Sequence, residues 1–155
     1  MPRNKQNLGI MKKLITILAT ITCFAAVAMA QPRAIGARIG YGAEVSYQHT
    51  LGGNNFGQLD LGWSQGGFSA GFSYDFSICP LGPLNFYLGP QISLAVVSAS
   101  GSSAFGMGAG AHIGLEYCFE RIPLQLSLDW KPTFVFVPGT AFAWSIPAFG
   151  IRYLF

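Results

Sequence analysis

The sequence predicts an all-β protein: a single antiparallel, eight-stranded, up-and-down transmembrane β-barrel. Three observations favour this fold class. Segment after segment alternates apolar and polar residues with the period of two that a β-strand imposes. Clusters of Gly, Pro, Asn and Ser separate these segments. The chain is 51% hydrophobic and 14% aromatic but only 10% charged, and a domain of that composition would be poorly soluble unless lipid covered part of it.

The first 30 residues predict an export signal rather than part of the barrel. A pair of lysines gives a positive start, an apolar run follows over residues 14–27, and the small residues Ala28 and Ala30 define a cleavage site before Gln31. These are the three parts of a secretory signal peptide. The apolar run is also shorter than the about 20 residues that a membrane-spanning helix needs. We therefore assign residues 1–30 to an N-terminal extension and cleaved signal peptide.

The barrel domain is predicted over residues 31–155, and its charge differs from that of the whole chain. Nine basic and six acidic residues give the chain a formal net charge of +3. Four of the basic residues precede Gln31, which leaves five against six acids and a net charge of −1. The barrel domain therefore has no basic patch of the kind that binds nucleic acid.

Eight strands follow from the alternation and the turn clusters. Residues 34–50 could form one long strand, which would make seven strands in all. We divide them near Gly40-Tyr41-Gly42, because single-chain bacterial barrels close with an even number of antiparallel strands. The predicted strands cover residues 34–39, 43–49, 56–63, 68–79, 84–97, 105–119, 123–137 and 141–155.

A soluble β-sandwich is the alternative, since its strands would also alternate. The polar faces weigh against it, because they are small and uncharged, with glycines such as Gly62, Gly71 and Gly114. Aromatic residues also gather near the strand ends, where membrane barrels place their interfacial girdles. The barrel is therefore the preferred interpretation.

The last six residues, Gly150-Ile151-Arg152-Tyr153-Leu154-Phe155, resemble the terminal-strand signature of bacterial outer-membrane proteins. That signature has a Gly, an aromatic or apolar residue three positions later, and a terminal Phe. The resemblance implies that Gly150, Tyr153 and Phe155 form a signal for the barrel-assembly machinery. Ala148 departs from the pattern, which usually has a polar residue two positions before the Gly.

Segments 34–38, 41–49, 113–117 and 123–132 resemble the small OmpA/OmpX-like outer-membrane barrel family, and the resemblance covers nearly all of the predicted domain. It implies eight strands, periplasmic termini, a location in the cell outer membrane and contact with its lipids. It implies no activity. Related proteins tend to have longer surface loops, whereas the first loop here almost vanishes.

The alternation, phased by Asp129 and Arg152, turns the charged side chains into the barrel. Charges inside a membrane protein must be paired or hydrated, because an isolated ion there is very costly. We predict a satisfied lumenal polar network that holds the strand register; a selectivity lining or a proton path is the alternative. The predicted network contains Arg38, Glu44, Asp60, Asp75, His112, Glu116, Asp129, Lys131 and Arg152.

No residue pattern predicts catalysis, a cofactor or a metal. His112 and Glu116 share one strand face with Asp75 near them, but they lack the spacing of a metal site. No nucleophile or phosphate-binding motif is present, so no enzyme is expected. Cys79 and Cys118 are predicted to point inward at one rim, on strands separated by one strand. Their separation of roughly 9–10 Å exceeds the about 7 Å that a disulfide allows, although curvature of the barrel shortens it a little. The sequence therefore does not decide whether the two cysteines form a disulfide.

The predicted function is that of a small, monomeric outer-membrane barrel with a side-chain-filled lumen and short loops, structural or envelope-related and without an assigned activity. A narrow channel for water or small ions is one alternative, and a surface recognition or adhesion barrel is another. The sequence does not separate them, and it names no ligand.

Overall fold

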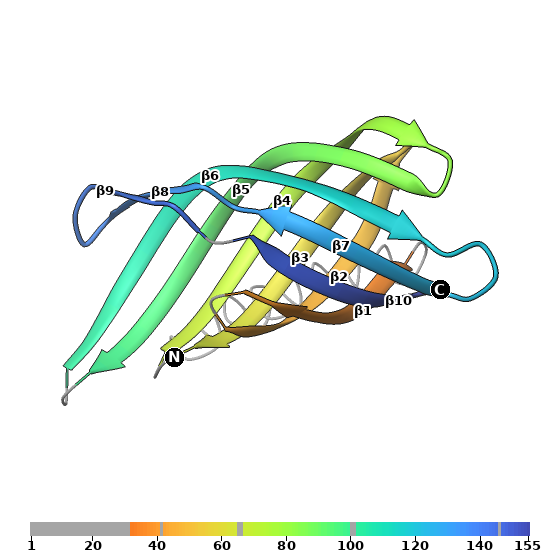
Figure 1. The fold of residues 1–155 in the computed structure, drawn as a ribbon. Helices are drawn as coiled ribbons and strands as arrows, with labels where there is room; N and C mark the ends of the chain where they lie inside the picture. The colour runs from red at the N-terminus through yellow and green to blue at the C-terminus, as the bar shows by residue number, and fades with distance from the viewer. Residues whose placement is uncertain (1–31, 41, 65–66, 100–101, 146) are drawn as a thin grey trace, which may run out of the picture. The chain divides into compact units, whose positions relative to one another are not determined.

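The computed structural model describes residues 32–155 except 41, 65–66, 100–101 and 146 (Figure 1). The predicted signal peptide and its cleavage site therefore lie outside the described residues. In the part of the chain that is described, no helix has the length and apolar character needed to cross a membrane.

Ten strands form one antiparallel sheet. They are β1 (Pro32–Ile39), β2 (Ala43–Gly52), β3 (Asn55–Ser64), β4 (Gly67–Leu81), β5 (Leu84–Ala99), β6 (Ser102–Cys118), β7 (Leu124–Trp130), β8 (Thr133–Val137), β9 (Ala141–Ala143) and β10 (Ala148–Leu154).

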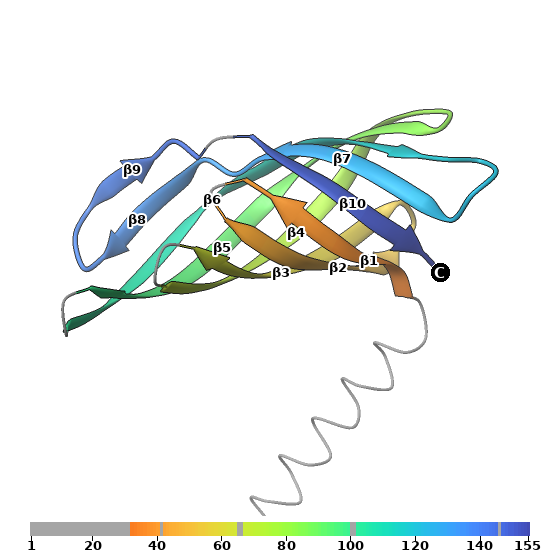
Figure 2. The ribbon, with the colours of Figure 1, turned by 60° about the horizontal axis from the view of Figure 1, so that its bottom comes forward.

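The sheet closes into a barrel with eight strand positions (Figures 1 and 2). Strands β1 to β6 follow one another around the wall, β6 pairs with β7 and β8, and β10 pairs with β7 and β1. The strands β7 and β8 share the seventh position, and β9 and β10 share the eighth. The predicted fold class is thus confirmed: an all-β, closed, eight-stranded antiparallel barrel.

Residues 123–137 and 141–155 were each predicted as one continuous strand, but each is divided in the structure, into β7 and β8 and into β9 and β10. The break between β7 and β8 falls after Trp130. Pro132 lies at the break and lacks the N–H that a ladder bond needs. Its carbonyl still accepts a hydrogen bond from Ala111 N at 3.2 Å. Ile113 on β6 pairs with Trp130 on one side of the break, and Gly110 pairs with Thr133 on the other. The wall therefore stays closed across the interruption.

The division of the first segment is confirmed, because β1 ends at Ile39 and β2 begins at Ala43. Two connections at the end of the barrel that carries the C-terminus, between β2 and β3 and between β4 and β5, are tight turns. Gly52, Gly53 and Gly82 adopt φ values of 129°, 57° and 64° there, a region that glycine enters without the steric cost of a Cβ.

The predicted inward orientation of Cys79 is wrong, and a β-bulge is the reason. The register between β4 and β5 shifts between Ser77 and Cys79. The extra residue turns Cys79 to the outer face opposite Phe86, as a bulge does when it re-aims the strand beyond it. Cys118 pairs with the buried Gln125 and keeps the inward phase. Both thiols are free, Cys79 exposed and Cys118 partly buried.

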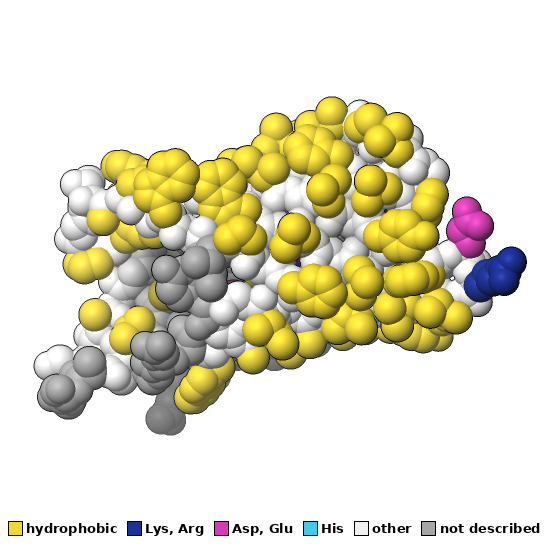
Figure 3. Space-filling view, viewed as in Figure 1, with side chains coloured by type: hydrophobic (Ala, Val, Ile, Leu, Met, Phe, Trp, Pro, Cys, Tyr) yellow, Lys and Arg dark blue, Asp and Glu magenta, His cyan; other side chains and the backbone are white. Residues whose placement is uncertain are grey.

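The polarity of the barrel is the reverse of that of a water-soluble domain. Outward side chains such as Leu128, Phe149 and Ile151 are about half exposed, and Figure 3 shows hydrophobic side chains over most of the viewed wall. The exposed charged residues Glu120 and Arg121 belong to the turn after β6. The buried interior consists mainly of polar and charged residues. Membrane barrels have this apolar-out, polar-in arrangement.

Candidate functional site: the polar lumen

All the charged residues predicted for the lumen have side chains directed into the barrel. Each lies on the inward phase of its strand except Lys131, which lies in the break between β7 and β8. Arg38, Asp60, Asp75, His112, Glu116, Asp129 and Arg152 are buried. Glu44 and Lys131 lie nearer the end of the barrel opposite the C-terminus, called the hairpin end below. Their side chains retain 27% and 13% exposure. The structure therefore brings together residues from most of the strands around the wall.

Asp129 on β7 is the central acceptor of the network. Arg38 from β1 donates from Nε to Asp129 Oδ1 at 2.7 Å and also forms an ion pair through Nη2. Arg152 Nη2 lies 3.9 Å from Asp129 Oδ2, and His112 Nε2 lies 3.5 Å from Oδ1. A buried carboxylate is stabilised only when charged partners and hydrogen bonds replace its water, and Asp129 has both.

Arg152 reaches across the lumen from β10. Its Nε donates to Ser46 Oγ at 3.0 Å, Nη1 donates to Ser127 Oγ at 2.7 Å, and Nη2 donates to Gln58 Oε1 at 3.2 Å. These partners lie on β2, β7 and β3. Arg152 is also the largest fully buried side chain, so one guanidinium both ties three strands together and fills the cross-section.

His112 on β6 lies between two carboxylates. Its Nδ1 is 2.9 Å from both carboxylate oxygens of Asp75 on β4, and Ser73 Oγ donates to Asp75 Oδ2 at 2.7 Å. The Tyr87 ring packs edge-on against the imidazole with a centroid distance of 5.1 Å. This group is fully enclosed, because Asp75, His112 and Tyr87 have no exposed surface.

A small residue makes room for the Tyr87 ring. An ideal Cβ built on Gly114 would lie 2.4 Å from Tyr87 Cζ and from its hydroxyl oxygen. No real Cβ approaches another heavy atom so closely. The tyrosine also packs at 5.2 Å, centroid to centroid, against the buried Phe56, so the middle of the lumen contains an aromatic pair as well as ions.

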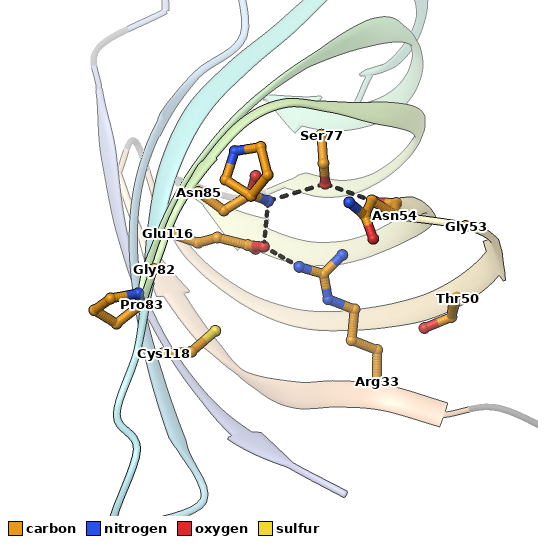
Figure 4. A pocket seen from close by; sticks show the side chains of 11 residues that line it. Arg33, Thr50, Gly53, Asn54, Ser77, Gly82, Pro83, Asn85, Glu116 and Cys118 are labelled. Atoms are coloured by element: carbon orange, nitrogen blue, oxygen red, sulfur yellow. Dashed lines mark hydrogen bonds and ion pairs between the residues drawn. The ribbon is translucent and has the colours of Figure 1, made fainter.

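Each end of the lumen opens into a vestibule. At the end with the C-terminus, a cavity of about 330 Å³ is lined by Arg33, Asn85, Glu116 and Cys118, among others (Figure 4). Arg33 forms an ion pair with Glu116, and Asn85 Nδ2 donates to Glu116 Oε1 at 2.8 Å.

The vestibule at the hairpin end has a volume of about 250 Å³ and is lined by Glu44, Asp60, Gln91, Lys131 and Thr133, among others. Lys131 forms an ion pair with Asp60, and Gln91 Nε2 donates to Thr133 Oγ1 at 2.6 Å. The two vestibules share no lining residue. A central layer of side chains lies between them, formed by Arg38, Tyr87, His112, Asp129 and Arg152.

Some lumenal residues lie outside the predicted polar network. Tyr87 and Phe56 follow the polar phase of β5 and β3, so the alternation itself could have identified them despite their aromatic rings. Arg33 carries no such signal. It lies next to the buried Ala34, yet its long side chain reaches Glu116 and lies 4.0 Å over the Phe56 ring.

The residues of the predicted assembly signal occupy β10 and the C-terminus. Gly150 is buried, and a Cβ there would lie 2.4 Å from Ser127 Oγ. Tyr153 and Phe155 point outward, with more than half of their surface exposed. Within the described residues, no group of three His, Cys, Asp or Glu side chains is arranged to hold a metal.

A closed eight-stranded barrel with an apolar exterior and an ionic interior defines the class of small membrane-type β-barrels. No family model matches the chain, and no curated protein matches it. A solved structure with a similar fold is Neisserial surface protein A (NspA), with a TM-score of 0.52, 17% sequence identity, and coverage of 80% of this chain and 94% of that one. At that identity the likeness establishes the fold.

Proposed function

We propose that this chain is a monomeric, integral barrel of the cell outer membrane with a closed lumen, and that its role in the envelope is structural. The observation that carries the proposal is the central layer, in which Arg38, Asp129, His112, Tyr87 and Arg152 leave almost no exposed surface. An eight-stranded barrel is just wide enough for side chains to fill it. Catalysis has no part in this proposal.

The membrane location is supported by three independent features. The exterior is apolar over most of the wall, which suits contact with lipid tails. Residues 1–30 carry the parts of an export signal. Tyr153 on β10 and Phe155 directly after it are exposed, where the barrel-assembly machinery could bind them during biogenesis.

A narrow channel for water or small ions is the second candidate. The two vestibules favour it, since cavities of about 330 and 250 Å³ leave only the central layer to cross. That layer is polar, so a small rearrangement of side chains would suffice to hydrate a path. The closed lumen remains the preferred proposal because every large side chain of the layer has several partners.

Conductance in planar bilayers separates the two functions. At acidic pH, the refolded chain from Gln31 onward should give a silent bilayer while its circular dichroism shows a folded barrel. The Arg152→Ala variant should then produce measurable current, because it removes the largest side chain from the central layer. Arg121→Ala is the matched control, since it removes an exposed arginine from the turn after β6 and leaves the lumen intact. Reproducible steps in the unmodified protein that vanish in Arg152→Ala would instead establish a channel.

A further inference from the structure

The lumen holds one more carboxylate than it has permanent cations. Its cations are Arg33, Arg38, Lys131 and Arg152, and its carboxylates are Glu44, Asp60, Asp75, Glu116 and Asp129. Arginine or lysine forms an ion pair with each carboxylate except Asp75. Among the described residues, the ion-pair partner of Asp75 is His112. Because Asp75 is fully buried, its charge depends on the proton that the histidine can carry.

The geometry around the imidazole suits the protonated ring. The Nδ1 atom lies 2.9 Å from both oxygens of Asp75 and 3.0 Å from Ser73 Oγ. Among the described residues, Nε2 has no hydrogen-bond partner, and it lies 3.5 Å from Asp129 Oδ1. A neutral ring that donates from Nδ1 would leave the Nε2 lone pair 3.5 Å from a carboxylate oxygen with no positive charge between them. An imidazolium donates from Nδ1 to Asp75, and its positive charge also lies 3.5 Å from Asp129.

We propose that His112 and Asp75 share one exchangeable proton and that this proton keeps the lumen closed. The inference rests on the proposed closed lumen and adds a pH-sensitive device to it. With the proton bound, the lumenal charges sum to zero. After its loss, Asp75 is an uncompensated buried anion, and two carboxylates face each other across a neutral ring. Water entering from the vestibules is the available compensation, because an unpaired buried charge is very costly.

The surrounding charges determine the direction of the effect. Asp129 faces the ring from β7 and is held by Arg38 on β1 and Arg152 on β10. Tyr87 packs on the ring from β5, and Glu116 lies further along β6, paired to Arg33 on β1. None of these arginines forms an ion pair with Asp75, so none replaces the lost proton. The lumen is therefore closed at low pH and loosens as the pH rises.

A pH titration of stability and conductance tests this device. The refolded chain, without a histidine tag, is unfolded by urea in vesicles at a series of pH values, and bilayer current is recorded at the same values. Loss of one proton changes the folding equilibrium constant up to about tenfold per pH unit. We expect the unmodified barrel to lose stability and to begin conducting as the pH rises. Asp75→Asn should lack both changes, since a neutral amide needs no counter-charge.

The matched control is His49→Gln, which removes the other histidine of the chain, a partly buried residue that stacks on Tyr47. This variant should keep the pH dependence. It also leaves His112 as the single histidine, so the ¹⁵N chemical shifts of the ring report directly whether both nitrogens are protonated. A ring that is neutral at acidic pH would overturn the inference even if Asp75→Asn failed to fold.

The two proposals fail in different ways. A current at every pH, including the acidic end, would refute the closed lumen of the proposed function. A barrel that stays silent and equally stable across the titration would leave the closed lumen intact and refute the proton device. Identical pH curves for the unmodified protein and Asp75→Asn would also refute it.

Discussion

Replacing Asp129 by alanine measures how much the lumenal network stabilises the barrel. The carboxylate accepts from Arg38 Nε at 2.7 Å, forms a second contact with the same guanidinium, and lies 3.9 Å from Arg152. Without it, Arg38 retains Glu44 as a partner, whereas Arg152 retains only neutral acceptors. Breaking a buried ion pair by removing one partner costs about 3–5 kcal/mol. We expect a loss of about 3 kcal/mol in the free energy of unfolding, because both guanidinium groups keep some partners.

The assay is reversible urea unfolding of the refolded barrel in lipid vesicles, followed by tryptophan fluorescence. The single change Arg38→Met and the double change Arg38→Met with Asp129→Ala complete a double-mutant cycle. The double variant should cost less than the two single variants together, by about 1–3 kcal/mol, since contacting residues couple over that range. Glu120→Ala is the control, an exposed acid whose loss should change stability by no more than about 0.5 kcal/mol. If Asp129→Ala unfolds within about 0.5 kcal/mol of the unmodified barrel, the network does not hold the strands together.

Three further predictions concern the lipid-facing exterior, the packing around Tyr87 and the C-terminus. Leu128→Arg on the outer face should lower the free energy of unfolding in vesicles by about 2–4 kcal/mol if it lies near the bilayer midplane, and an arginine tolerated there would contradict the lipid-facing assignment. Gly114→Ala should lower the free energy of unfolding by about 1–3 kcal/mol, because the new Cβ would lie 2.4 Å from Tyr87 Cζ and 2.7 Å from Asp129 Cβ. The same change in a Tyr87→Leu background is its control and should cost less, because the closer of the two contacts is then removed; an equal cost in both backgrounds would contradict this account. Deleting Phe155 should reduce the yield of folded barrel in cells, with no effect on refolding of the purified chain, and an unchanged yield would show that the terminal motif is incidental.

Much of the wall could be predicted because the alternation along a strand is a local property. The alternation phased by Asp129 and Arg152 predicted which side chains of the last two strand positions face inward. The polar phase of β5 and of β3 likewise includes Tyr87 and Phe56. The need for an even strand number placed a turn near Gly40, and β1 and β2 do meet there. Local patterns could not predict the bulge near Cys79, since one extra residue in a strand reverses every orientation beyond it.

The alternation along the chain predicts the strand positions, the polarity of the two faces and therefore the class of barrel. Which lumenal groups meet depends on the folded barrel, because partners across a closed sheet are set by its register and stagger. Arg33 and Glu116 are 83 residues apart in the chain, and Arg152 and Ser46 are 106 apart. The position of His112 between Asp75 and Asp129 likewise requires β4, β6 and β7 to be aligned at one height. Charge pairing in the lumen therefore depends on closure of the sheet, whereas the alternation of apolar and polar residues is a property of each strand by itself.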